Sequence, residues 1–403
     1  MAELQAVLLC SGAGTRMTSL TDHQPKCLLP VVGVPMFLYP LASILRAGLI
    51  EVKILVRDNI KNLVESSVQK AKLLEQFPKA HVEYIKVNRD YEDYGSADLV
   101  RHYFGKSVKD LLIVSCDYVS DGSLIPLIDF YRVFSATLVG LVSKNASNGP
   151  TPGEKKKKAK VSDYIAFEEE TFRLAYLCAD EDFEDDVETE KWSERFPKLS
   201  LTAKLTDCHV YILRHTALPK LVQQKKLTSI KADFVPFLIE EQYKESSDVT
   251  CYAYPQLHEN GAVVARANTL ATYHEVNKSM LKSFERIWTS RGRGKIVQTR
   301  GPYVPGEYRV DESCIIGENV NLKRSVVDAG SKLGDKVKIK ESVVGKNVVI
   351  GSGSSITDCI ICDGVEIGEN VDLTNCIVTM KQKVPAKTKL QNEVVEEEEE
   401  WTA

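Results

Sequence analysis

The C-terminal part of the chain carries a repeat with a period of 17 residues, which restricts the fold more than any other feature. Within each period, aliphatic residues recur after six, five and six positions, and one of them precedes a glycine. Hexapeptide repeats of this kind are typical of parallel β-helices, in which each aliphatic side chain stacks inward on the one below. The residues in this register are Ile316, Leu322, Val327, Leu333, Ile339, Val344, Ile350, Ile356, Ile361, Ile367 and Leu373. The spacing predicts four coils of a β-helix.

The first 143 residues alternate between short apolar strands and helices. This rhythm predicts βαβ crossovers and a mostly parallel, doubly wound α/β sheet of the Rossmann-like type. Ligands of such sheets lie beyond the carboxyl ends of the strands. The expected strands are residues 5–9, 52–56, 82–87, 111–116 and 136–143, and the expected helices are residues 36–47, 60–74, 96–104 and 124–134.

A glycine-rich turn follows the first expected strand. It contains Gly12 and Gly14, ends in Thr15-Arg16, and is followed by Lys26 ten residues after Arg16. A turn of this kind directs backbone N–H groups at one point, where phosphate oxygens can be held. Arg16 and Lys26 would bring positive charge to the same place. A loop that only reverses the chain is the alternative interpretation, and the appended Thr-Arg and Pro-Lys pairs make it the less favoured one.

This motif resembles the signature of the nucleotidyltransferases that join a sugar 1-phosphate to a nucleoside triphosphate. The chain departs from the signature at Ser11, where the family usually has its first glycine. The resemblance implies that Asp117, at the end of the fourth expected strand, stands in the place of a Mg²⁺ ligand. It also implies that the turn beginning at Gly95 packs against the base. The matching residues are Gly12, Gly14, Thr15, Arg16, Pro25, Lys26, Leu28, Leu29 and Pro30.

A second carboxylate of the active relatives has no counterpart here. The family places it in a turn late in the sheet domain, and the corresponding segment, residues 263–273, reads VVARANTLATY. Mg²⁺ relies on carboxylates and substrate phosphates for its octahedral shell, so a single carboxylate holds it weakly. We therefore expect no catalytic residue, no metal site and no cofactor, but a vestigial nucleotide pocket. Its residues are Gly12, Gly14, Arg16, Lys26, Gly95 and Asp117.

Longer segments are similar to a narrower family, the gamma subunits of eukaryotic translation initiation factor 2B. They are SCDYVSD (115–121), the Pro-Gly-Lys loop (150–158), SIKADFVPFLI (229–239), ANTL (267–270) and NEVV (392–395). The resemblance covers nearly the whole chain, with a shorter linker, and implies a left-handed β-helix after the sheet domain.

Membership of that family implies a non-catalytic subunit of a guanine-nucleotide exchange factor. The implied partners are the catalytic epsilon subunit, the alpha, beta and delta regulatory subunits, and translation initiation factor 2. The implied role is to promote GDP release from that factor. Two other hypotheses stay open: an active enzyme similar to GDP-mannose pyrophosphorylase, and a catalytically dead partner of such an enzyme.

Charge and composition limit the functions that the chain can have. A net charge of −4 argues against direct nucleic-acid binding. No apolar run approaches the roughly 20 residues of a membrane span. The ten scattered cysteines indicate reduced thiols in a cytoplasmic protein. Charged stretches at 145–160, 179–190 and 393–401 are expected to be solvated loops or a disordered tail, with partner binding as the alternative.

These patterns divide the chain into four parts. We expect a nucleotidyltransferase-like domain over residues 1–273 and a helical and basic linker over 274–311. The β-helix is expected over 312–385, and an acidic tail over 386–403.

Overall fold

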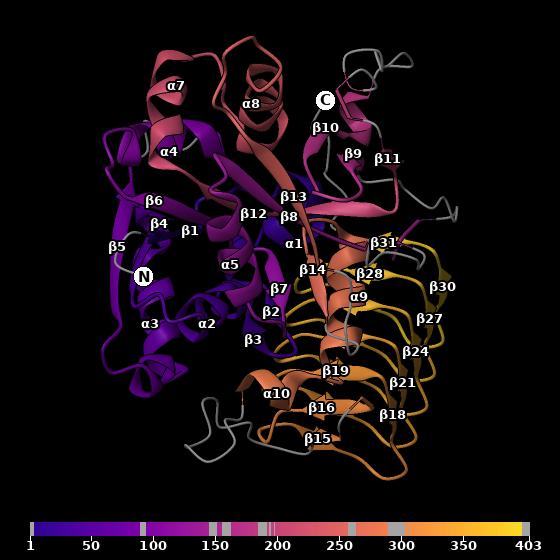
Figure 1. The fold of residues 1–403 in the computed structure, drawn as a ribbon. Coiled ribbons are helices and arrows are strands. Elements are labelled where there is room, and N and C mark those ends of the chain that lie inside the picture. Colours follow the sequence, from indigo (N-terminus) through magenta and orange to yellow (C-terminus); the bar gives the residue numbers. More distant parts are fainter. Residues whose placement is uncertain are drawn as a thin grey trace, which may run out of the picture.

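The computed structural model of the chain describes residues 4–88, 94–144, 151–154, 163–183, 192, 195–196, 198–256, 263–288, 303–304 and 306–396. A sheet covered by helices forms the N-terminal domain, and a stack of short parallel strands forms the C-terminal domain beside it (Figure 1). The lysine run at 155–158, residues 184–190, the basic linker 290–302 and most of the glutamate run lie outside the described residues.

A seven-stranded sheet forms the centre of the N-terminal domain. The strand order is β13-β8-β12-β6-β1-β4-β5, and within this sheet only β12 runs antiparallel to its neighbours. The prediction of a mostly parallel, Rossmann-like sheet is confirmed. The strands are β1 (Leu4–Leu9), β4 (Glu51–Arg57), β5 (His81–Val87), β6 (Asp110–Ser115), β8 (Leu138–Lys144), β12 (Leu205–Leu213) and β13 (Cys251–Gln256).

Helices cover both faces of this sheet. Successive side chains of a strand point to opposite faces, and accordingly Ala6 and Leu8 of β1 belong to one apolar core while Val7 and Leu9 belong to another. The first core is completed by α2 (Leu38–Arg46), α3 (Lys61–Lys70) and α5 (Ile125–Phe134). The second is completed by α4 (Ser96–Phe104), α7 (Leu218–Gln223) and α8 (Val235–Glu241).

Smaller elements surround the central sheet. Their bounds are α1 (Thr18–Thr21), β2 (Pro30–Val31), β3 (Val34–Pro35), β7 (Tyr118–Ser120), β9 (Asp163–Glu168), β10 (Leu174–Ala179), β11 (Leu199–Thr202) and β14 (Val264–Arg266). β2 and β3 form a hairpin, β7 pairs with β14, and β9 lies between β10 and β11. The β7–β14 pair matters most for the site, because it brings a late segment of the chain next to the end of β6.

The C-terminal domain is a parallel β-helix with three faces. One face contains the parallel strands β16 (Tyr308–Val310), β19 (Ser325–Val327), β22 (Val343–Val344), β25 (Ile360–Ile361), β28 (Ile377–Val378) and β31 (Val394–Val395), and β15 (Tyr303–Val304) pairs antiparallel with β16 at its edge. The second contains β17 (Ile315–Ile316), β20 (Lys332–Leu333), β23 (Val349–Ile350), β26 (Glu366–Ile367) and β29 (Lys383–Val384). The third contains β18 (Asn321–Lys323), β21 (Lys338–Lys340), β24 (Ser355–Thr357), β27 (Asp372–Thr374) and β30 (Lys389–Gln391). The last strands lie beyond residue 385, in the part that the sequence assigned to the tail.

The predicted 17-residue register is the register of the stack, since Leu333 pairs with Ile350 and Ile350 with Ile367. Residues from Val327 to Leu373 in this register are buried. Ile316 pairs with Leu333 in this register but is 41% exposed, because it lies in the first coil of its face.

Each coil turns its three corners through residues with left-handed backbone conformation. Those of one corner, Arg324, Glu341, Asp358, Asn375 and Asn392, follow one another at 17-residue intervals, each with φ near +50°. This conformation is unfavourable for most side chains. The regular recurrence shows that the stacking of the coils imposes it.

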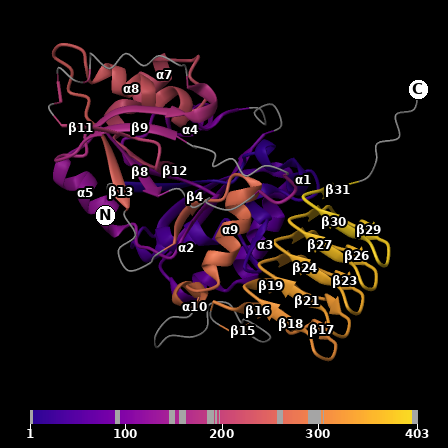
Figure 2. The same ribbon diagram turned by 90° about the vertical axis from the view of Figure 1, so that its right-hand side faces the viewer.

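A helix and a loop join the two domains. In Figure 2, α9 (Leu270–Met280) lies between the N-terminal domain and the stack. The Tyr273 hydroxyl donates to the Pro30 carbonyl oxygen at 2.6 Å, and a His274 ring nitrogen lies 2.7 Å from the Glu341 carbonyl oxygen. A turn over residues 281–283 separates α9 from α10 (Phe284–Trp288). At the far end of the stack, the Gly153 N–H donates to the Asn375 carbonyl oxygen at 2.8 Å.

Candidate functional site

The glycine-rich turn leaves the carboxyl end of β1 at Cys10. Gly14 has a left-handed φ of 82°, and a Cβ there would stand 2.7 Å from the Thr21 Cγ2 atom. The Thr21 hydroxyl donates to the Gly14 carbonyl oxygen at 3.0 Å. Gly14 is therefore required by its backbone and by the packing of α1. Gly12 is exposed and has nothing within 4 Å of the Cβ position, so the local packing does not require a glycine there.

Lys26 and Asp117 meet beside this turn. Asp117 comes two residues after β6 ends, and Lys26 begins a short 3₁₀ helix, Lys26–Leu28. The Lys26 Nζ atom lies 2.5 Å from the Asp117 Oδ2 atom, with the Lys26 side chain 11% exposed and the Asp117 side chain 1% exposed. Both residues were assigned to this site from the sequence, and the structure brings them into contact.

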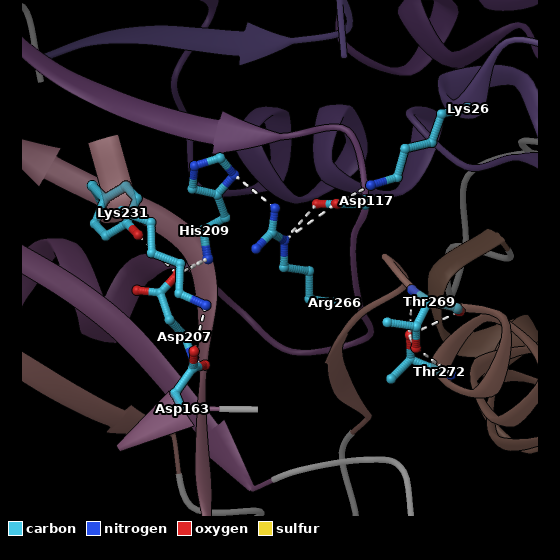
Figure 3. A network of polar contacts seen from close by, with 10 residues as sticks. Lys26, Asp117, Asp163, Asp207, His209, Lys231, Arg266, Thr269 and Thr272 are labelled. Carbon is cyan, nitrogen blue, oxygen red and sulfur yellow. Dashed lines mark hydrogen bonds and ion pairs between the residues drawn. The ribbon is translucent and has the colours of Figure 1, made fainter. Parts of the chain in front are cut away.

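Arg266 is the second cation on the same carboxylate, as Figure 3 shows. β14 pairs with β7 so that Arg266 lies opposite Tyr118, the residue after Asp117. The Arg266 Nε atom lies 3.3 Å from Asp117 Oδ1 and 3.2 Å from Oδ2. The Ala267 N–H donates to the Asp117 carbonyl oxygen at 2.8 Å. The sequence analysis considered only that residues 263–273 contain no acidic residue. It did not identify Arg266 as part of the site.

The positive charges of Lys26 and Arg266 keep Asp117 ionised. Burial alone would raise the pKa of the Asp117 carboxyl, but Arg266 and Lys26 outweigh burial and hold that pKa well below its ordinary range. Burial likewise would lower the pKa of Arg266, and the charges of Asp117 and Asp207 raise it instead. One carboxylate is thus shared by two cations.

His209 extends the cluster on the side of Arg266. It lies in an irregular part of β12, between Asp207 and Tyr211, with a left-handed φ of 54°. Its Nδ1 atom is 3.3 Å from the Arg266 Nη2 atom. Burial and then the charge of Arg266 lower the pKa of His209 well below its ordinary value, so the ring is neutral at physiological pH. A neutral ring adds no charge to the two cations.

A second ion-pair cluster lies beside the first. Lys231 forms a close ion pair with Asp163, which is fully buried, and the other carboxylate oxygen of Asp163 accepts from the Asp207 N–H at 2.8 Å. The Tyr211 hydroxyl donates to Asp207 at 2.8 Å. Lys231 belongs to the SIKADFVPFLI segment, so this segment serves to anchor the sheet domain around β9 and β12 (Figure 3).

The turn at Gly95 is covered by the protein itself. A Cβ on Gly95 would stand 2.1 Å from the Thr228 carbonyl oxygen. That oxygen accepts from the Ala97 N–H at 2.8 Å, and the Ile230 N–H donates to the Ser96 hydroxyl at 2.9 Å. The chain between α7 and α8 therefore lies against the Cβ side of Gly95. Arg16, the last residue of the predicted nucleotide pocket, lies in a 3₁₀ helix, Thr15–Met17, and is exposed.

Nothing in the described part of the chain offers a ready metal site. Among those residues, no group of three or more His, Cys, Asp or Glu side chains is arranged to hold a metal ion. None of the described helices is long and apolar enough to cross a membrane. The assignment of the six residues to a nucleotide pocket stays a prediction.

Comparison with known proteins finds two family models that match parts of the chain and several similar proteins. A family model described as "Nucleotidyl transferase" matches residues 5–147, and one described as "GMPPB C-terminal domain" matches residues 301–398. The translation initiation factor eIF2B subunit gamma of Caenorhabditis elegans is 56% identical over the full length of both chains. The subunit gamma of Schizosaccharomyces pombe is 24% identical over 79% of this chain and 74% of its own. The eIF2B subunit epsilon of Dictyostelium discoideum is 22% identical over 69% of this chain and 38% of its own.

Proposed function

The chain belongs to the family of eIF2B gamma subunits, and from that premise we propose that it acts in translation initiation as a non-catalytic subunit of the eIF2B complex. In this role it pairs with the epsilon subunit, and the pair promotes GDP release from translation initiation factor 2. The nucleotidyltransferase fold then serves as a scaffold for assembly in the cytoplasm. The alpha, beta and delta subunits are the further partners we propose.

The arrangement around Asp117 is the observation that carries the non-catalytic part of this proposal. Nucleotidyl transfer needs Mg²⁺, held by carboxylates, to neutralise the charge that develops on the phosphates. Here the single carboxylate at that place is already paired with Lys26 and Arg266. A divalent cation at Asp117 would meet two positive side chains at contact distance. Both would have to move before the ion could bind.

The predicted nucleotide pocket combines an open turn with a covered one. The turn at Gly12 is open, whereas the space beside Gly95 is filled by Thr228. We propose that Gly12, Gly14, Arg16, Lys26, Gly95 and Asp117 persist as a structural remnant of a nucleotide pocket. In this interpretation their present role is to hold the strand ends together.

The first prediction concerns catalysis. We expect the purified chain, supplied with Mg²⁺, GTP and mannose 1-phosphate, to release no pyrophosphate above the protein-free background, because no divalent cation can be held at Asp117. A coupled pyrophosphate assay measures this, with an active GDP-mannose pyrophosphorylase as the positive control. Robust release that is lost in Asp117→Asn would overturn the scaffold proposal in favour of an active enzyme.

The second prediction concerns partners. Affinity purification of the tagged chain from its own cells is expected to recover a larger subunit with the same order of sheet domain and β-helix, together with the other eIF2B subunits. Mass spectrometry identifies the recovered proteins, and an unrelated tagged protein provides the background. Recovery of the chain alone contradicts the proposal. Recovery of an active pyrophosphorylase in place of the epsilon subunit supports the third hypothesis, a dead partner of such an enzyme.

A further inference from the structure

One face of the β-helix carries a group of lysines on its first two strands. This face contains β18, β21, β24, β27 and β30, and it lies along the side of the stack turned away from the N-terminal domain (Figure 1). Ile339 of β21 points into the apolar core, so its neighbours Lys338 and Lys340 point outward. Lys323 of β18 pairs with Lys340, and Lys336 lies at the corner before β21. These four lysines, the lysine face, are all exposed.

No acid on the first two strands balances this charge. β18 reads NLK and β21 reads KIK, and Lys323 lies directly opposite Lys340, an arrangement in which like charges are destabilising. In the part of the chain that the structure describes, no ion pair joins these lysines to an acid. The carboxylates of Glu341 and Asp358 lie 3.7 and 3.9 Å from the Lys278 Nζ atom instead. Lys340 acts on Asp358 only from beyond ion-pair distance.

The following coils show that the fold does not require these lysines. In the register of the stack, Thr357 takes the place of Lys340 one coil further on. Ser355 and then Asp372 take the place of Lys338. Uncharged and even acidic side chains therefore stack in the same columns, and the positive charge is a property of the first two coils.

The corner before β21 supports the same conclusion. Lys336 has a left-handed φ of 57°, and the equivalent corners of the neighbouring coils hold Asn319 and Gly353. Asparagine and glycine adopt this conformation more readily than lysine does. A lysine at this corner is therefore not explained by the backbone, and what it adds is a further positive charge beside Lys338.

The geometry of the face indicates which anion fits it. Lys338 and Lys340 are two residues apart on one strand, a rise of about 6.6 Å, and Lys323 lies on a strand about 4.8 Å away. Alternate side chains of an extended peptide have the same rise, so carboxylates on alternate residues match the lysines. The five strands of this face contain no aromatic residue on which a nucleic-acid base could stack. An acidic polypeptide fits this surface better than a nucleic acid.

We propose that the lysine face is a docking surface for an acidic segment of a partner protein, bound in an extended conformation. Its glutamate or aspartate carboxylates pair with Lys323, Lys338 and Lys340. The hydroxyls of Ser355 and Thr357, next to these lysines, donate to the remaining carboxylate oxygens. A single exposed ion pair contributes little, so the affinity comes from several pairs together and falls as salt is added. The proposal rests on the β-helix alone and holds whichever complex the chain joins.

The test measures binding of an acidic probe to the full-length chain. The probe is a short fluorescein-labelled peptide in which glutamate alternates with threonine, and fluorescence anisotropy reports its binding. We expect saturable binding at low ionic strength that weakens as salt is added. The same peptide with glutamine in place of glutamate should not bind. Binding of the neutral peptide with equal affinity overturns the proposal, because charge would then not be what the face recognises.

A triple variant tests the lysines themselves. Lys323→Thr, Lys338→Ser and Lys340→Thr replace them with residue types that the next coil has in the same columns, so the fold should be kept. Circular dichroism checks this. We expect the triple variant to bind the acidic peptide at least about tenfold more weakly. If it fails to fold, Lys336→Asn, which introduces the residue type of the preceding corner, takes its place and should weaken binding by a smaller factor.

The controls separate this surface from general attraction and from other occupants. Lys72→Gln, Lys106→Gln and Lys225→Gln together remove the same charge from exposed positions of the N-terminal domain and should leave binding unchanged. Equal weakening in this control, or unchanged binding in the lysine-face variants, overturns the proposal. Tighter binding of oligouridylate than of the peptide also overturns it, in favour of a nucleic acid. Binding that appears only after glutamates 397–400 are changed to glutamine would assign the face to the chain's own tail instead of a partner.

Discussion

Asp117→Ala is expected to lower the free energy of unfolding of the chain by about 3–5 kcal/mol, the usual cost of removing one partner from a buried ion pair. The substitution leaves the Lys26 ammonium and the Arg266 guanidinium almost buried and without their shared counter-charge. Urea unfolding of the full-length chain, followed by circular dichroism, measures the change.

An exposed ion pair provides the matched control. Glu170 pairs with Lys198, with both side chains more than 60% exposed. Because exposed pairs contribute little, Glu170→Ala should change the free energy of unfolding by less than about 1 kcal/mol. An equal loss in the two variants would contradict the view that the Asp117 cluster is a structural element.

The same ion pair gives a pH dependence with a definite sign. The pKa of Asp117 is held well below its ordinary value in the folded chain, whereas in the unfolded chain it is about 3.9. The unfolded chain therefore takes up the proton first as the pH falls. The stabilisation by Asp117 is complete above about pH 5 and is lost progressively below about pH 4. The difference in unfolding free energy between the wild type and Asp117→Asn should shrink accordingly between about pH 5 and pH 3.

Gly351→Ala is expected to destabilise the chain by about 1–3 kcal/mol, the range found when a packed site is overfilled. A Cβ at Gly351 would stand 2.5 Å from the Gly368 carbonyl carbon and 2.6 Å from the Glu369 nitrogen. These are backbone atoms of the next coil, held by the parallel pairing of β23 with β26. They cannot rotate away as a flexible side chain could. Thermal unfolding followed by circular dichroism measures the loss.

Gly12→Ala is the control for this prediction, since nothing lies within 4 Å of a Cβ at Gly12. The free energy of unfolding of that variant should change by no more than about 0.5 kcal/mol, the range of surface substitutions. Its melting temperature should therefore stay close to that of the wild type. Similar melting temperatures for the Gly351 and Gly12 variants would mean that the coils can separate to accept a methyl group. The close stacking described here would then be wrong.

Local patterns explain why so much of the fold was predictable. The 17-residue period repeats within a short stretch of chain, so the paired residues Leu333, Ile350 and Ile367 can be found by spacing alone. The parallel sheet was predictable for the same reason, because each β-strand and helix carries its own apolar pattern. The exposure of Ile316 could not be read from the period, which does not show where the stack begins.

Contacts between distant segments explain what the sequence did not show. Lys26 and Asp117 were assigned to one site only because the family resemblance places both there. Arg266 follows Asp117 by 149 residues, and no local pattern links the two. The cover over Gly95 also comes from far along the chain, since Ile230 follows Ser96 by 134 residues. The proximity of Lys26 and Asp117 was therefore predicted, whereas Arg266 and the cover over Gly95 were missed.

Helix α9 has a consequence for how the protein unfolds. Its side chains are tied to both domains, since Asn277 accepts from the Val32 N–H at 2.8 Å and Lys278 pairs with Glu341 of the β-helix. Neither domain can lose its structure without exposing one face of this buried helix. The two domains, although segments of each match different family models, should thus melt as one cooperative unit. A substitution in a distant coil would then shorten the lifetime of the whole subunit.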